Sequence, residues 1–180
     1  MLRLSLLAFA TGCAAHAAAP VVTITQPPPP PETAQVAPVE LPPPPVPADY
    51  VRVSVANVGE SQVDLTDPTE QIVVPIYIGG TEAASIQHRY GHTSASRPLT
   101  HDLFDSALHE LGARVVRAQV DKLEHDTYYA TLVLKQSHRY IQLDARPSDA
   151  IALALGANAP IFCASRVLAA AGEPRDSKQP

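Results

Sequence analysis

The sequence predicts a single α+β domain with a mostly antiparallel or mixed sheet and about four helices. Segments with strand patterns outnumber those with helical patterns, and most of them follow one another directly. Turn residues, not helices, separate three consecutive strand patterns between residues 114 and 145. This order argues against a doubly wound parallel sheet, in which a helix follows each strand.

Three strands are expected at the start of the domain. Residues 50–58 (YVRVSVANV) alternate apolar and polar side chains, and residues 61–67 form a weaker second pattern. Residues 71–78 are rich in β-branched side chains and stop at two glycines. Pro75 cannot donate a ladder hydrogen bond, so we expect an edge or irregular position there. An exposed edge at this point would permit pairing with a second copy of the chain, as a homo-oligomer.

Two helices should follow. Residues 81–90 have helical composition and end at Gly91. After a polar loop, we expect Thr100 to cap a helix that ends near Leu111, with Gly112 just beyond. The apolar residues of this second helix fall on one face, which predicts that the face packs in the core: Leu103, Phe104, Ala107, Leu108 and Leu111.

The C-terminal half begins with an antiparallel meander of residues 114–122, 127–135 and 139–145. A helix from Pro147 to Gly156 follows, and it is apolar on most sides.

The chain should end with a short strand at 161–164 and a helix at 165–172. Cys163 has apolar neighbours and reads as a small buried residue, not as an activated nucleophile. The tail beyond Gly172 is expected to be loose, with residues 175–180 outside the domain.

Residues 1–19 resemble an export signal, with Arg3 before a short apolar run and small residues after it. In one interpretation, cleavage before Cys13 exposes a thiol for lipidation, and the protein is a membrane-anchored lipoprotein of a bacterial envelope. In another, cleavage after Ala17 releases a soluble secreted or periplasmic protein. A chain without export is the third alternative.

Residues 20–48 are a proline-rich linker. The chain has 19 prolines, and twelve of them lie between Pro20 and Pro47. Proline fixes φ and removes a hydrogen-bond donor, so this segment should be an extended spacer and not a packed element. The folded domain is then expected at residues 49–174, which carry ten Lys and Arg against fifteen Asp and Glu. An acidic domain does not favour broad binding of a polyanion.

Four segments resemble the bifunctional nuclease family of small domains with DNase and RNase activity. They are VVPIYIGGTEAASI at 73–86, RPLTHDLF at 97–104, YYATLVL at 128–134 and LDARPSDAIALALGANAPIF at 143–162. The resemblance extends over roughly residues 50–172. It implies hydrolysis of phosphodiester bonds in DNA and RNA with low sequence preference, with nucleic acid as the substrate.

Phosphodiester cleavage uses carboxylates that hold divalent metal, histidine as acid or base, and arginine to clamp phosphate, so Mg²⁺ or Mn²⁺ is expected. The catalytic candidates are His101, Asp102, Asp144, Arg146 and Asp149. The candidate metal ligands are Asp102, Asp144, Asp149 and Glu82. The resemblance also implies Arg97, Thr100 and Ser148 as substrate-binding residues. This chain has Gly156 where family members often have arginine, so one phosphate-contacting cation is expected to be missing.

Structural explanations stand beside this interpretation. Carboxylates in the first turn of a helix are favourable for the helix dipole alone, and Ser148 could simply be a cap. Arg146 could pair with Asp144 or Asp149 to hold the turn together. Tyr128 or Tyr129 could stack on a base, or pack in the sheet. The alternative functions are a non-catalytic, envelope-tethered module that binds a ligand or protein, and a scaffold.

Overall fold

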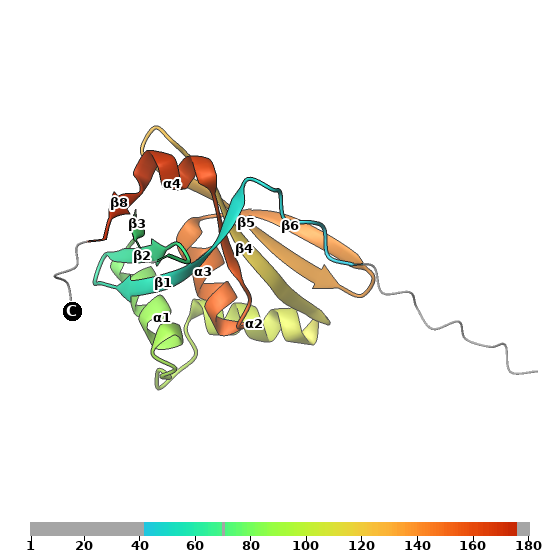
Figure 1. Ribbon diagram of the computed structural model, residues 1–180. Coiled ribbons are helices and arrows are strands. Elements are labelled where there is room, and N and C mark those ends of the chain that lie inside the picture. Colours follow the sequence, from blue (N-terminus) through green and yellow to red (C-terminus); the bar gives the residue numbers. More distant parts are fainter. Residues whose placement is uncertain (1–41, 70, 176–180) are drawn as a thin grey trace, which may run out of the picture. The chain divides into compact units, whose positions relative to one another are not determined.

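A computed structural model describes residues 42–69 and 71–175. The expected export signal with Cys13, most of the proline-rich linker and the last five residues lie outside the described residues. The described part is one α+β domain of four helices and an eight-stranded mixed sheet, which confirms the expected fold class (Figure 1). No helix in these two ranges is long and apolar enough to cross a membrane.

The sheet has the strand order β6-β5-β4-β7-β1-β2-β3-β8. Only the pair of β4 and β7 is parallel, and the other neighbours are antiparallel. The strands are β1 (Tyr50–Val58), β2 (Gln62–Thr66), β3 (Ile72–Tyr77), β4 (Ala113–Glu124), β5 (Thr127–Gln136), β6 (Arg139–Ala145), β7 (Ile161–Ala164) and β8 (Glu173–Pro174). The expected meander is therefore present as β4, β5 and β6.

Strand β1 connects the two halves of the sheet. Residues 50–53 pair with β7, whereas residues 54–58 pair with β2 across a register shift. Val53 of this strand is buried in the core, in agreement with the two-residue alternation predicted from the sequence.

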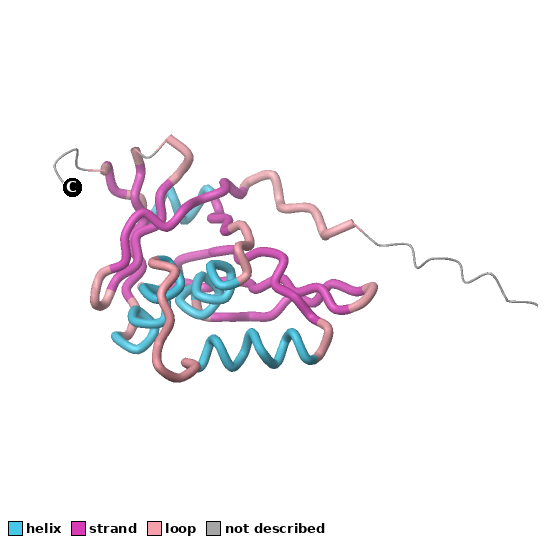
Figure 2. Tube along the Cα trace, turned by 90° about the horizontal axis from the view of Figure 1, so that it is seen from below, coloured by secondary structure: helices cyan, strands magenta, loops and turns pink. Residues whose placement is uncertain are grey.

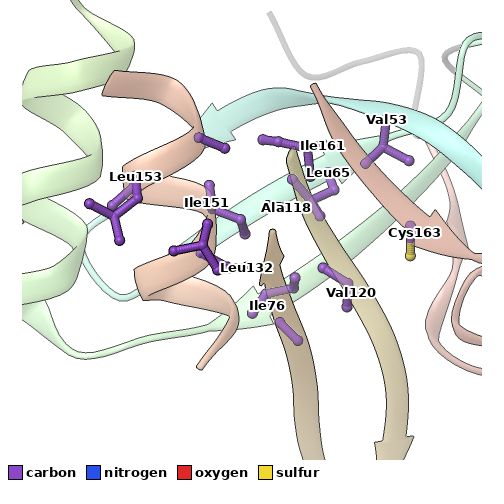
Figure 3. Close-up of a cluster of buried hydrophobic side chains, with 14 of the residues drawn as sticks. Val53, Leu65, Ile76, Ala118, Val120, Leu132, Ile151, Leu153, Ile161 and Cys163 are labelled. Carbon is purple, nitrogen blue, oxygen red and sulfur yellow. The ribbon is translucent and has the colours of Figure 1, made fainter. Parts of the chain in front are cut away.

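The helices are α1 (Gly80–Tyr90), α2 (Thr100–Glu110), α3 (Pro147–Gly156) and α4 (Ser165–Ala171). Helix α3 is the most buried, because it packs against α1 and α2 as well as β4 and β5. Figure 3 shows Ile151 of this helix in one apolar cluster with Leu132 and Ala118 of the sheet. Cys163 is fully buried in the same cluster, and burial raises the pKa of its thiol to about 12, as expected for an inert cysteine.

Residues 173–175 differ from the loose tail that the sequence predicts. Glu173 and Pro174 form β8 opposite Ile72 and Val73, and the Arg175 N–H donates to the carbonyl of Gln71. Strand β8 covers only the beginning of β3. Pro75 pairs with Asp64 on one side and lies beyond this cover, in agreement with the edge position predicted for it.

Helix α2 is less buried than its apolar pattern predicted. Of the five apolar residues, only Leu108 is buried, whereas Leu103 and Leu111 are each 66 % exposed. In both Figure 1 and Figure 2, α2 lies at the lower edge of the domain, beside the long strands. The N-cap is Leu99 and not Thr100, and the Asp102 carboxylate accepts the Leu99 N–H at 2.8 Å.

The last residues of the proline-rich segment contact the domain. The guanidinium of Arg117 on β4 donates to the carbonyl of Pro44 at 2.8 Å, and Pro44 and Val46 are half-buried. Residues 42–47 have no regular secondary structure, but they are not the unpacked spacer that the sequence predicted. Proline lacks a donor but keeps a free carbonyl acceptor, which suits a cation on the sheet surface.

Candidate active site

Three helices begin at one cavity of about 400 Å³. Its lining includes Thr81 from the start of α1, Thr100 from the start of α2, and Arg146, which is the N-cap of α3. None of these three described helices has a side chain that caps its first N–H groups. Because each helix N-terminus carries about half a positive charge, their convergence favours an anion in this cavity.

Each of the three helices carries an acid at its third position, and the three acids have different surroundings. Asp102 of α2 is turned to its own N-cap and to the Arg89 guanidinium at 2.8 Å. Glu82 of α1 and Asp149 of α3 line the cavity. The dipole explanation is therefore sufficient for Asp102, whereas the other two carboxylates are also placed to act on a ligand.

A hydrogen-bonded chain of three side chains crosses the cavity wall. The Ser85 hydroxyl lies 2.8 Å from Nδ1 of His101, and Nε2 of His101 lies 3.2 Å from Oδ1 of Asp149. The three residues come from α1, α2 and α3 in that order. Ser85 and His101 are buried, at 4 % and 9 % exposure, so the imidazole is fixed in position.

The ionisation of Asp149 determines which atoms donate and which accept in these two hydrogen bonds. Partial burial raises the pKa of Asp149, but hydrogen bonds from Arg146 and His101 lower it by more, so the carboxyl group is ionised at neutral pH. An ionised carboxylate only accepts, hence Nε2 of His101 carries the proton. In the neutral imidazole Nδ1 is then an acceptor for the Ser85 hydroxyl.

Arg146 bridges the two carboxylates of the cavity. Its Nε and Nη2 donate to Asp149 at 2.8 and 3.0 Å, and its Nη1 lies 2.8 Å from Oε1 of Glu82. These hydrogen bonds raise the pKa of Arg146 further above its ordinary value. The side chain is nevertheless 65 % exposed. Three of the five N–H donors of a guanidinium are used, and the remaining two are available to a ligand.

Asp144 is not part of this arrangement. It pairs with Thr131 across the sheet, whereas the neighbours of Thr131 along β5, Ala130 and Leu132, point into the core beneath α3. Paired residues share a face and successive residues alternate, so Asp144 lies on the opposite face of the sheet from Asp149. The structure therefore does not bring together the two aspartates that are five residues apart in the sequence.

The substrate-binding candidates are also separated. Thr100 lines the cavity at the start of α2. Ser148 is not the cap of α3 but the second helical residue, and it lines a neighbouring cavity. Arg97 is exposed in the loop before α2 and does not line the cavity.

The four expected metal ligands do not fit a shared ion. Residues 42–69 and 71–175 contain no group of three or more His, Cys, Asp or Glu side chains that could hold one. Asp102 is bound to Arg89, Asp144 faces away, and the guanidinium of Arg146 lies between Glu82 and Asp149. These are not the open oxygen ligands that Mg²⁺ prefers.

Ser85 is not among the candidates predicted from the sequence, although one pattern in the sequence indicates it. Ser85 follows Glu82 by three residues, so both side chains lie on the same face of α1. When a serine shares a helix face with a candidate site residue, it is itself a candidate site residue that a histidine could contact. Nothing local in the sequence indicates that His101, sixteen residues away, is that partner.

Fold and site together define an α+β domain with a cavity at three helix N-termini, and its lining contains a Ser-His-Asp chain and an arginine. A model of the bifunctional nuclease domain matches residues 63–176, and the chain belongs to this family. Two uncharacterized proteins of Mycobacterium tuberculosis, MT1877 and Rv1829, are each 39 % identical to it over 99 residues. The match covers 55 % of this chain and 58 % of each relative. Strand β1, in the centre of the sheet, precedes the part matched by the family model.

Proposed function

We propose that the cavity at the three helix ends hydrolyses phosphodiester bonds in DNA and RNA with low sequence preference. The observation that carries the proposal is the Ser85-His101-Asp149 chain, which lies at a cavity toward which three helix N-termini converge. Family membership supports a nuclease-related function. The helix ends supply the positive potential that the acidic composition of the domain does not.

In the proposed reaction, the helix N-termini and the two free N–H donors of Arg146 hold the phosphate. A water molecule attacks phosphorus and gives its proton to the Ser85 hydroxyl, while the Ser85 proton passes to Nδ1 of His101. Asp149 stabilises the resulting imidazolium. The bond from phosphorus to the leaving oxygen breaks, the leaving oxygen takes a proton from solvent, and His101 returns its proton to solvent. Water as nucleophile needs no 2′-hydroxyl, so the proposed reaction applies to DNA as well as to RNA.

The test is cleavage of single-stranded DNA and RNA oligonucleotides by the purified chain and its variants. His101→Asn and Asp149→Asn should each lower the rate roughly 100-fold or more, the usual contribution of a positioned acid or base. Asp144→Asn is the matched control and should keep full activity, because Asp144 lies on the other face of the sheet. Each assay is run with Mg²⁺, with Mn²⁺ and with EDTA, which also tests the expected metal dependence.

Cleavage that survives in folded His101→Asn would contradict the site, as would equal losses in the Asp144 and Asp149 variants. Oligonucleotide binding without any cleavage by the unaltered chain would instead support a non-catalytic binding module.

A further inference from the structure

Arg146 separates the cavity described above from a second cavity of about 450 Å³. This second cavity is lined by the end of β3, the turn between β4 and β5, and the start of α3. Because Arg146 lines both cavities, a ligand with a phosphate on this guanidinium extends directly into the second one. A volume of this size accommodates a nucleoside-sized group.

Tyr77 is the most exposed large apolar residue of the second cavity. Its side chain is 74 % exposed, whereas Val74 and Ile76 on the same strand are buried. Core packing therefore does not account for an aromatic residue at this position. Proteins that bind single-stranded nucleic acids stack the bases on exposed aromatic rings and contact the phosphates with nearby positive charges.

The lining of the cavity also carries polar groups. Ser148 is one of them and is only 5 % exposed. Asp126 and Thr127 lie at the rim, in the turn between β4 and β5. Tyr128 forms a fixed wall, since its hydroxyl donates to the carbonyl of Pro75 at 3.0 Å. Ser148 and the rim residues can meet the polar edge of a ring that stacks on Tyr77.

We propose that the second cavity is a nucleobase subsite in which Tyr77 stacks on the base next to the phosphate at Arg146. The subsite rests on the proposed function, because that function places the phosphate. It selects single-stranded nucleic acid, since both faces of a base in a duplex are covered by its neighbours.

The experiment measures two quantities on the full chain: the Kd for a fluorescent single-stranded oligonucleotide, and the KM and kcat of cleavage. Tyr77→Ala should weaken binding and raise KM about 10-fold, within the range for loss of one stacked base, with little change in kcat. Tyr77→Phe should restore binding. Tyr129→Ala is the control, because Tyr129 is also partly exposed but lies under the Lys122 ammonium and lines neither cavity.

The two proposals fail in different ways. Cleavage that is unaffected by Tyr77→Ala overturns the subsite and leaves the nuclease proposal intact. Binding that depends on Tyr77 without any cleavage supports the subsite and overturns the nuclease proposal. Equal affinity for an oligonucleotide whose bases are replaced by abasic residues overturns the subsite, and a chain that neither binds nor cleaves overturns both.

Discussion

No side chain fits at position 156, because the Arg89 guanidinium occupies the space next to Gly156. A Cβ at this position would overlap Nη1 of Arg89 and lie 2.9 Å from a carboxylate oxygen of Asp105. Arg89 is only 7 % exposed and is held by Asp102 at 2.8 Å and Asp105 at 2.7 Å. The family resemblance predicts that a cation is missing at the end of α3. The structure places an arginine from α1 there, but two carboxylates neutralise it.

Gly156→Ala should therefore destabilise the domain by about 1–3 kcal/mol, as expected for overpacking of a filled site. The control is Gly80→Ala, where a Cβ would meet only the Glu60 carbonyl oxygen at 3.9 Å. That variant should change stability by less than about 0.5 kcal/mol. Urea unfolding measures both. A Gly156→Ala variant as stable as Gly80→Ala would show that Arg89 is free to leave its two carboxylates.

Four of the candidate site residues lie together in the structure, and Asp144 does not lie with them. Glu82, His101, Arg146 and Asp149 do lie together, because each stands in or next to the first turn of a helix that begins at the cavity. Proximity in the chain predicts that Asp144 lies with Arg146. Its side chain belongs to a strand, and the face it takes depends on pairing with Thr131, which local sequence does not specify.

At the scale of the element, α2 contributes its beginning to the site and only one narrow face to the core. His101 and Leu108 are its buried residues, and they lie seven positions apart, two helical turns, on the same face. The remaining apolar residues are exposed. Apolar periodicity gives the direction of an amphipathic face, but how much of the face is covered depends on what packs against it.

Leu108→Ala should cost about 2–5 kcal/mol, because it leaves a cavity in the core. Leu103→Ala removes the same atoms from a side chain that is 66 % exposed and should cost less than about 0.5 kcal/mol. Thermal unfolding of the two variants provides the comparison. Similar losses in both would mean that Leu103 is covered in solution, for example by a second copy of the chain.

At the scale of the whole molecule, residues 42–47 complete the face of the sheet that carries Arg117. This side chain is 4 % exposed, and burial lowers its pKa from the ordinary value. Its acceptors are Gln119 at 2.7 Å and the carbonyl of Pro44 at 2.8 Å. Loss of an acceptor from a buried guanidinium lowers the stability of the folded state. The end of the proline-rich segment supplies one of these acceptors and is therefore part of the folded domain.

A chain that begins at Ala48 should be less stable than one that begins at Pro42, by about 1–3 kcal/mol. Arg117→Met should reduce this difference, because the variant has no buried charge to satisfy. Denaturant unfolding of the four chains forms a double-mutant cycle. The interpretation is wrong if the difference is unchanged in the methionine variant.

The sequence by itself determined the fold class, nearly all helix and strand positions, and the placing of an acid in the first turn of three helices. These properties are encoded within a few neighbouring residues, by periodicity and by the preferences of helix ends. Only the tertiary structure decided that the three helices begin at one cavity, that Ser85 and His101 meet there, and that Asp144 does not. Those outcomes depend on strand register and helix packing between residues far apart in the chain.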